Sequence, residues 1–169
     1  MRLVFVRHAE STANAEGRYQ GHSDHELSPR GRGQAERLAS RLADEGFQPT
    51  HVYSSPLRRA EETAAILTRS WSVAVEYLDD LKEYDIGILS GLTADEIADR
   101  HPEIDMEMEW SRQLERIEGA EPLRARRARA TREVERTLAL HQDGDVALLV
   151  THGGILQHIL AALMGTERT

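Results

Sequence analysis

The feature that most constrains the fold is a short apolar run near the start of the chain that ends abruptly at two polar residues. Leu3–Val6 is rich in β-branched residues, as expected of a strand buried on both faces of a sheet. Arg7 and His8 follow it directly. In open α/β sheets, side chains just beyond the carboxyl ends of strands meet the ligand. An isolated Arg-His pair would more often cap a strand and form surface hydrogen bonds, so the rest of the chain must decide its role.

Three further apolar segments and five helical patterns follow the first strand. We expect strands at residues 50–54, 73–77 and 146–150, and helices at 28–46, 55–69, 93–101, 122–141 and 155–165. The Ser-Pro pairs at 28–29 and 55–56 combine a preferred N-cap with proline at the first helical position. Strands that alternate with helices predict an α/β fold with three layers, α/β/α, around a mainly parallel central sheet.

Length, composition and charge restrict the class of protein. A chain of 169 residues can form one substantial core, so we expect a single domain over 1–169. No apolar run approaches the roughly 20 residues of a membrane span, and we therefore expect a cytoplasmic protein without a membrane partner. The formal net charge of −8 argues against nonspecific nucleic-acid binding. The lack of cysteine excludes disulfides, thiolate metal sites and a cysteine nucleophile.

Two stretches without a strong pattern are predicted to form lids over the strand ends. The first covers about residues 10–27 and the second about residues 91–121. An apolar patch near the second lid is expected from Met106, Met108 and Trp110. The histidines and aspartate of the first lid have no regular element to hold them on one face, so no metal site is predicted there.

Residues suited to phosphate chemistry follow all four predicted strands. They are Arg7 and His8 after the first, Arg58 after the second, Glu83 after the third and His152 after the fourth. Parallel strands bring these positions to one edge of the sheet. Arginine binds phosphate oxygens bidentately and histidine can attack phosphorus. Arg59 is expected to point elsewhere, because consecutive helical residues diverge by about 100°.

The same strand ends carry short motifs whose order along the chain is highly specific. They read Arg7-His8-Ala9-Glu10 with Asn14, Ser54-Ser-Pro-Leu-Arg58, Leu81-Lys-Glu83 and Thr151-His-Gly-Gly154. From residue 1 to about 165 the chain resembles the histidine phosphatase superfamily, also called phosphoglycerate-mutase-like. The stretch Gln20-Gly21-His22 resembles the substrate-side loop of its phosphatase branch. Two departures are an alanine at position 9 in place of the commoner glycine, and Gly-Ala-Glu-Pro at 119–122 where many members have Gly-Gly-Glu-Ser.

The resemblance implies a role for each of these residues. His8 would be the nucleophile that forms a phosphohistidine, and Glu83 the acid that protonates the leaving oxygen and later activates water. The phosphoryl oxygens would be bound by Arg7, Arg58, His152 and Asn14. The substrate would also be contacted by Gln20, Gly21 and Gly153. The resemblance implies no cofactor and no metal ion.

Three functions are compatible with these roles. We favour a metal-independent phosphomonoester hydrolase that acts on a small phosphorylated metabolite. The alternative is a phosphoglycerate mutase, in which the same phosphohistidine returns its phosphoryl group to another hydroxyl. Cofactor-dependent mutases are usually longer after the third strand, where this chain offers only residues 91–121. A non-catalytic module that binds a phospho-ligand is least favoured, because such a module is expected to lack at least one of the reactive residues.

The first strand is expected at an edge of the sheet. The family strand order runs two, four, one, and members usually continue into a further strand beside strand one, whereas this chain stops at Thr169. A bare edge made of Leu3–Val6 would invite pairing. We therefore expect a second copy of the chain, in a homodimer, or another segment of this chain to cover the edge. A third possibility is that the 169 residues are a shortened form of a longer natural chain.

Overall fold

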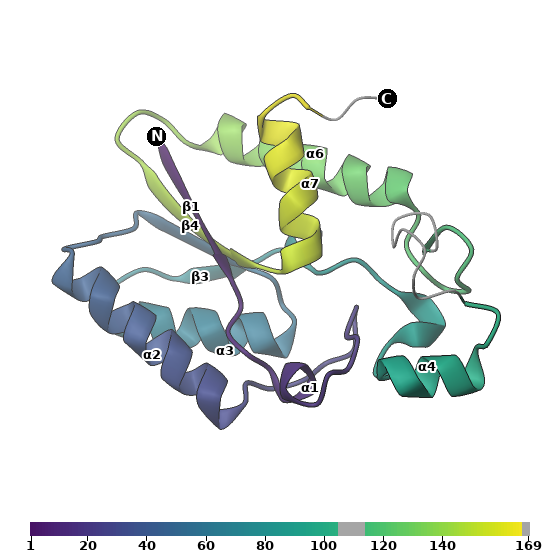
Figure 1. The fold of residues 1–169 in the computed structure, drawn as a ribbon. Helices are drawn as coiled ribbons and strands as arrows, with labels where there is room; N and C mark the ends of the chain where they lie inside the picture. Colours follow the sequence, from purple (N-terminus) through teal and green to yellow (C-terminus); the bar gives the residue numbers. More distant parts are fainter. Residues whose placement is uncertain (105–113, 167–169) are drawn as a thin grey trace.

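The computed structural model describes residues 1–104 and 114–166 and shows an α/β fold (Figure 1). Its elements are β1 (Arg2–Arg7), α1 (Thr12–Ala15), α2 (Pro29–Asp44), β2 (His51–Ser54), α3 (Arg58–Leu67), β3 (Val75–Tyr77), α4 (Ala94–Arg100), α6 (Leu123–Leu140), β4 (Val146–Thr151) and α7 (Gly153–Leu163). All four predicted strands and all five predicted helices are confirmed, with ends that move by up to three residues. The patch expected from Met106, Met108 and Trp110 lies outside the described residues.

The four strands form one parallel sheet in the order β1-β4-β2-β3. In its register Arg7 pairs with Thr151, the last residue of β4. Ser54, the last residue of β2, pairs with Val150 of β4 and with Tyr77 of β3. The four strands therefore end at nearly the same level, and the residues that follow them meet at one edge of the sheet.

Helices cover both faces of the sheet, which confirms the predicted three layers (Figure 1). Val4 and Val6 of β1 pack into a core on the face covered by α2 and α3. Leu3 and Phe5 point to the opposite face, where their core includes residues of α6 and α7. This alternation follows from the two-residue period of a strand. It explains why β1 reads as a continuous apolar run: both of its faces are covered.

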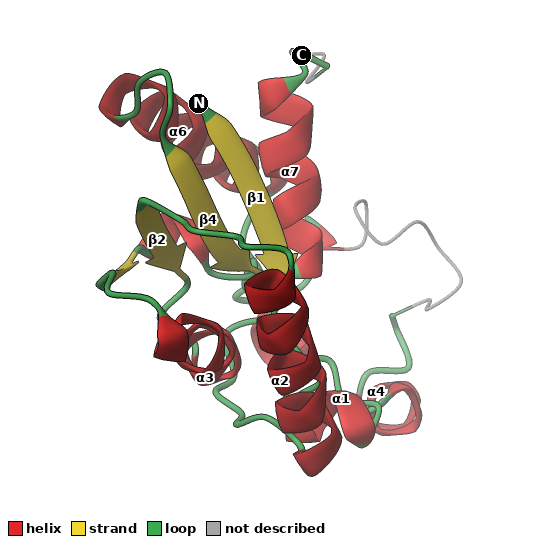
Figure 2. Cartoon of the chain, turned by 90° about the vertical axis from the view of Figure 1, so that its left-hand side faces the viewer, coloured by secondary structure: helices red, strands yellow, loops and turns green. Residues whose placement is uncertain are grey.

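β1 is an edge strand, as the sequence predicted (Figure 2). Among the described residues its only strand partner is β4. The side chains of Leu3–Val6 are half-buried, and α7 packs beside Leu3 and Phe5. The cover expected for the free edge, a second copy or another segment, stays a prediction.

The first predicted lid lies against residues at the start of the second, at the carboxyl end of the sheet. The backbone N–H of Tyr19 donates to the carbonyl of Leu92 at 2.9 Å, which ties the first lid to the start of the second. A separate apolar cluster stabilises this end, formed by Ile86, Leu89, Ile97, Leu114 and Ile117. Within residues 1–104 and 114–166, the helices are too short or too polar to cross a bilayer.

Candidate active site

A pocket of about 470 Å³ opens where the strands end. Seven of its lining residues carry charged side chains, imidazole or amides, and these are Arg7, His8, Asn14, Arg18, Gln20, Arg59 and Glu83. The pocket therefore unites the residues after β1, those of the first lid and the acid loop, which we define as residues 79–85 between β3 and the second lid. Five of these seven side chains were predicted; Arg18 and Arg59 were not.

His8 is fixed by the end of β1 and by a hydrogen bond of its own ring. Its backbone N–H donates to the carbonyl of Thr151 at 2.9 Å, which extends the pairing of β1 with β4. Its Nδ1 lies 2.7 Å from the carbonyl of Ala9 and must donate there, so the lone pair of the neutral ring is on Nε2. Burial, reinforced by the charges of Arg59 and Arg7, lowers the pKa of His8 to about 4. The imidazole is therefore neutral, as a nucleophile must be.

His152 lies against His8, with ring centroids 4.9 Å apart. It is fully buried, and its Nε2 lies 2.8 Å from the hydroxyl oxygen of Ser55. Its Nδ1 is buried and has no hydrogen-bond partner among the residues that the structure describes. Burial and the nearby charge of Arg59 lower the pKa of His152 well below its usual value. A buried polar atom without a partner is costly. His152 lies behind His8 and is not itself among the residues that line the pocket.

The arginine after β2 is predicted one position too early. Arg58 is half-exposed and lies outside the pocket: its guanidinium bonds Glu26 at 2.8 Å and Glu62 at 3.0 Å. Arg59, which was expected to point elsewhere, is 1% exposed and lines the pocket. Burial lowers the pKa of Arg59 to about 10, which still leaves it charged at neutral pH. Arg59 replaces Arg58 as the candidate phosphate ligand of α3.

The start of α3 explains this error. The Ser-Pro pair at 55–56 predicted a helix from residue 55, whereas α3 begins at Arg58 with Leu57 as its N-cap. The spacing of charges in the sequence was the signal that could have found the correct arginine. Arg58 stands four residues before Glu62, which is typical of an exposed ion pair, and Arg59 stands four before Thr63, which is buried.

Glu83 holds its carboxylate at the start of α7. Oε2 accepts the backbone N–H of Gly154 at 2.9 Å, and Oε1 accepts that of Ile155 at 2.8 Å. Such free N–H groups at a helix start favour an anionic partner. Position 154 requires glycine, because a Cβ there would lie 2.7 Å from Glu83 Oε1 and 2.1 Å from the ring of Tyr84. Gly153 lies beside Arg7: a Cβ at position 153 would be 3.5 Å from Arg7 Nε.

The two amide side chains of the first lid have their oxygens engaged. Asn14 Oδ1 accepts the backbone N–H of Ser11 at 3.1 Å in a capping box at α1. Gln20 Oε1 accepts the hydroxyl of Ser11 at 2.7 Å. Each side chain can therefore offer N–H donors to an anion in the pocket. Gly21 contributes backbone: its carbonyl accepts Arg59 Nη2 at 2.9 Å.

Two arginines of α6 were misjudged from the sequence. The basic residues of this helix alternate with glutamates, which predicted a solvated face, yet Arg126 and Arg129 are buried. Arg129 bonds Glu121 and two carbonyls of the acid loop. Helical spacing could not identify Arg129 as buried, because the two carbonyls that it bonds are remote in sequence.

A sequence model of the histidine phosphatase superfamily (branch 1) matches residues 3–169. The chain belongs to this superfamily. Two relatives from Arabidopsis thaliana are each 37% identical over 93% of the chain: phosphoglycerate mutase-like protein 4, and a metal-independent phosphoserine phosphatase. The chain spans 68% of the length of the first and 66% of the second. These two relatives are thus equal in sequence identity to this chain.

Solved structures of the superfamily agree in fold. A mycobacterial glucosyl-3-phosphoglycerate phosphatase, in complex with VO3, is 31% identical and superposes with a TM-score of 0.80. The match covers 97% of this chain and 80% of that one. Membership of a superfamily of phosphatases and phosphomutases supports an enzyme; the type of reaction must be argued from the site.

Proposed function

We propose that this protein is a metal-independent phosphomonoester hydrolase that acts on a small phosphorylated metabolite through a phosphohistidine. The observation that carries the proposal is the neutral, buried imidazole of His8, which has its lone pair on Nε2 and lines the pocket together with Arg7 and Arg59. A neutral nucleophile next to fixed cations suits attack on a phosphoryl group, because the cations stabilise the charge that spreads over its oxygens.

In the first step, His8 Nε2 attacks phosphorus and the bond from phosphorus to the ester oxygen breaks. Arg7, Arg59 and the amide of Asn14 bind the nonbridging oxygens. Glu83, a carboxylate at rest, takes up the proton of an ester bound as its monoanion and gives it to the departing oxygen, so the product leaves as a neutral alcohol.

In the second step, Glu83 takes a proton from water as that water attacks the phosphohistidine. The nitrogen–phosphorus bond breaks, inorganic phosphate forms, and the ring of His8 returns to its neutral form. Glu83 then passes this proton to the product phosphate, so each group is restored to its starting state, and no metal ion or cofactor is needed to balance the reaction.

The second candidate is a phosphoglycerate mutase. The relative from Arabidopsis thaliana that is named mutase-like supports it, since this relative is as similar to the chain as the phosphoserine phosphatase. The two reactions differ only in whether water or a substrate hydroxyl receives the phosphoryl group. The Gln20-Gly21-His22 stretch and the limited length of residues 91–121 support the hydrolase.

A panel of phosphomonoesters tests this choice. Phosphoserine, sugar phosphates and 3-phosphoglycerate, the last with and without 2,3-bisphosphoglycerate, are assayed for free phosphate and for isomerised product. We expect free phosphate from at least one ester and no isomer. Isomer formation that exceeds phosphate release would identify a mutase, and binding without turnover of any ester would identify a non-catalytic module.

A further inference from the structure

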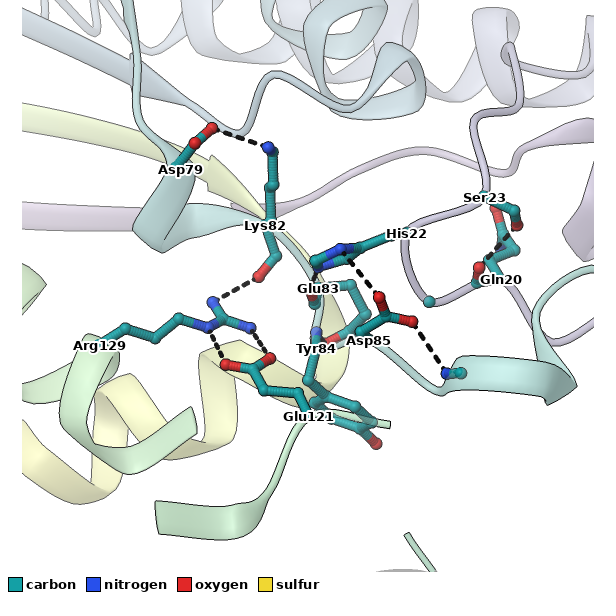
Figure 3. A network of polar contacts seen from close by, with 12 residues as sticks. Gln20, His22, Ser23, Asp79, Lys82, Glu83, Tyr84, Asp85, Glu121 and Arg129 are labelled. Atoms are coloured by element: carbon teal, nitrogen blue, oxygen red, sulfur yellow. Dashed lines mark hydrogen bonds and ion pairs between the residues drawn. The ribbon is translucent and has the colours of Figure 1, made fainter. Parts of the chain in front are cut away.

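The main chain of the acid loop is held from outside the pocket by side chains of other segments (Figure 3). His22 Nε2, in the first lid, lies 2.7 Å from the carbonyl oxygen of Glu83 itself. Arg129 Nη1, from α6, donates to the carbonyl of Lys82 at 2.7 Å and to that of Asp80 at 2.9 Å. The main chain of the loop is therefore held at three carbonyls, those of Asp80, Lys82 and Glu83.

His22 is placed to hold the backbone of Glu83 without contact to the substrate. A carbonyl oxygen only accepts, so Nε2 of His22 donates. Its Nδ1 lies 3.4 Å from Oδ2 of Asp85, which is two residues after Glu83 in the acid loop. His22 itself does not line the pocket; it lies in a separate hollow with Asp85 and Arg129.

The segment that carries His22 is anchored by the phosphate-binding arginine. Arg59 Nη2 donates to the carbonyl of Gly21 and Nη1 to that of Ser23, each at 2.9 Å. These are the two neighbours of His22. The buried guanidinium of the pocket and the backbone of Glu83 are thus joined through three consecutive residues of the first lid.

We propose that His22 is a positioning residue for Glu83, fixing the main chain from which the proton donor reaches the leaving oxygen. The inference rests on the proposed function, in which Glu83 is that donor. At rest, the carboxylate accepts the N–H groups of Gly154 and Ile155, so it must turn about its own side-chain bonds to reach a substrate. The accuracy of this movement depends on a fixed backbone, and misplacement by about 1 Å can cost a hundredfold in rate.

A positioning role differs from a merely stabilising one in its dependence on the leaving group. An alkyl phosphate requires protonation of its departing oxygen, whereas p-nitrophenolate leaves without a proton. Loss of the hydrogen bond from His22 should therefore slow only reactions that need the acid. General damage to the fold would slow both substrates alike.

The test compares kcat for an alkyl phosphate with kcat for p-nitrophenyl phosphate in the full chain. For His22→Ala we expect kcat to fall about tenfold with the alkyl ester and less than about twofold with the aryl ester. His22→Gln should restore most of the loss, since its amide nitrogen can donate to the same carbonyl. Arg132→Gln is the matched control. Among the residues that the structure describes, Arg132 bonds the carboxylate of Asp80 alone, on the surface, and the ratio of the two rates should stay unchanged.

Glu83→Gln, alone and combined with His22→Ala, separates this inference from the proposed function. If His22 acts through Glu83, its replacement adds no further loss in the Glu83→Gln background. One outcome would overturn the positioning role alone. In it, Glu83→Gln lowers kcat mainly for the alkyl ester, whereas His22→Ala lowers kcat equally for both esters or not at all. No selective loss in Glu83→Gln would overturn the acid role of Glu83, and the inference with it.

Discussion

The two halves of the pocket are built in different ways. His8 and His152 follow directly from β1 and β4, whose register pairs Arg7 with Thr151, so backbone hydrogen bonds of the sheet fix their positions. Glu83 belongs to a loop whose carbonyls are held by His22 and Arg129, residues remote from it in sequence. The comparison indicates that the backbone of the sheet fixes the phosphate end, whereas the acid end depends on contacts between separate segments.

The largest expected effect comes from neighbouring arginines. Arg59→Met should lower kcat/KM by about 10³-fold, because it removes a buried cation from the phosphoryl group. Arg58→Met should change it less than about threefold, because exposed ion pairs contribute little. Steady-state kinetics with p-nitrophenyl phosphate measure both. Similar losses in the two variants, or a larger loss for Arg58→Met, would mean that Arg58 binds the phosphoryl group, as the sequence predicted.

Glu83→Gln should produce the next largest effect, and one that depends on the substrate. We expect kcat to fall about 10²-fold for an alkyl phosphate, which needs a proton on its leaving oxygen. For p-nitrophenyl phosphate the fall should stay within a few-fold. Equal falls for both esters would mean that Glu83 only positions the phosphoryl group, and Asp79, Asp80 and Asp85 would become the candidate acids.

His8 should make the folded protein sensitive to acid. Its pKa is about 4 in the folded state and near 6.5 when unfolded, so between these values only the unfolded chain binds the proton. Stability therefore falls as the pH falls, by about 2 kcal/mol from this residue between pH 7 and pH 5. Urea unfolding at both pH values should show a smaller decrease for His8→Gln. The same decrease in wild type and variant would contradict the neutral, buried imidazole.

The smallest expected effect is that of a chelator. Among residues 1–104 and 114–166, the structure shows no group of three or more side chains suited to hold a metal ion. Incubation with EDTA, followed by dialysis, should leave the hydrolysis rate unchanged. Activity that disappears and returns with Mg²⁺ or Zn²⁺ would place a metal ion in the mechanism.

The strand-end half of the pocket could be predicted from the sequence, because a buried parallel strand and the residue after it are local features. Arg7, His8 and His152 needed only the period of the apolar runs and the rule that such strands end together. Arg59 required the true start of α3, and a shift of the expected start by three residues exchanged it for Arg58.

The clamp on the acid loop lay beyond any local pattern. Arg129 stands on a helix whose alternating charges are typical of a solvated face, and its burial depends on carbonyls of Asp80 and Lys82, which precede it by 49 and 47 residues. The segment around His22 has no helical or strand periodicity. Contacts of this kind follow from how loops pack on one another, which spacing along a chain does not encode.

The central claim is a covalent bond between His8 and phosphorus, and trapping this bond tests it most directly. The protein is mixed with a ³²P-labelled phosphomonoester, quenched in alkali, digested and mapped by mass spectrometry. We expect a label on the peptide containing His8 that is stable in alkali and lost in acid, and no label in His8→Ala. An acid-stable label on a serine would contradict the account, and so would turnover of substrate by the His8→Ala variant.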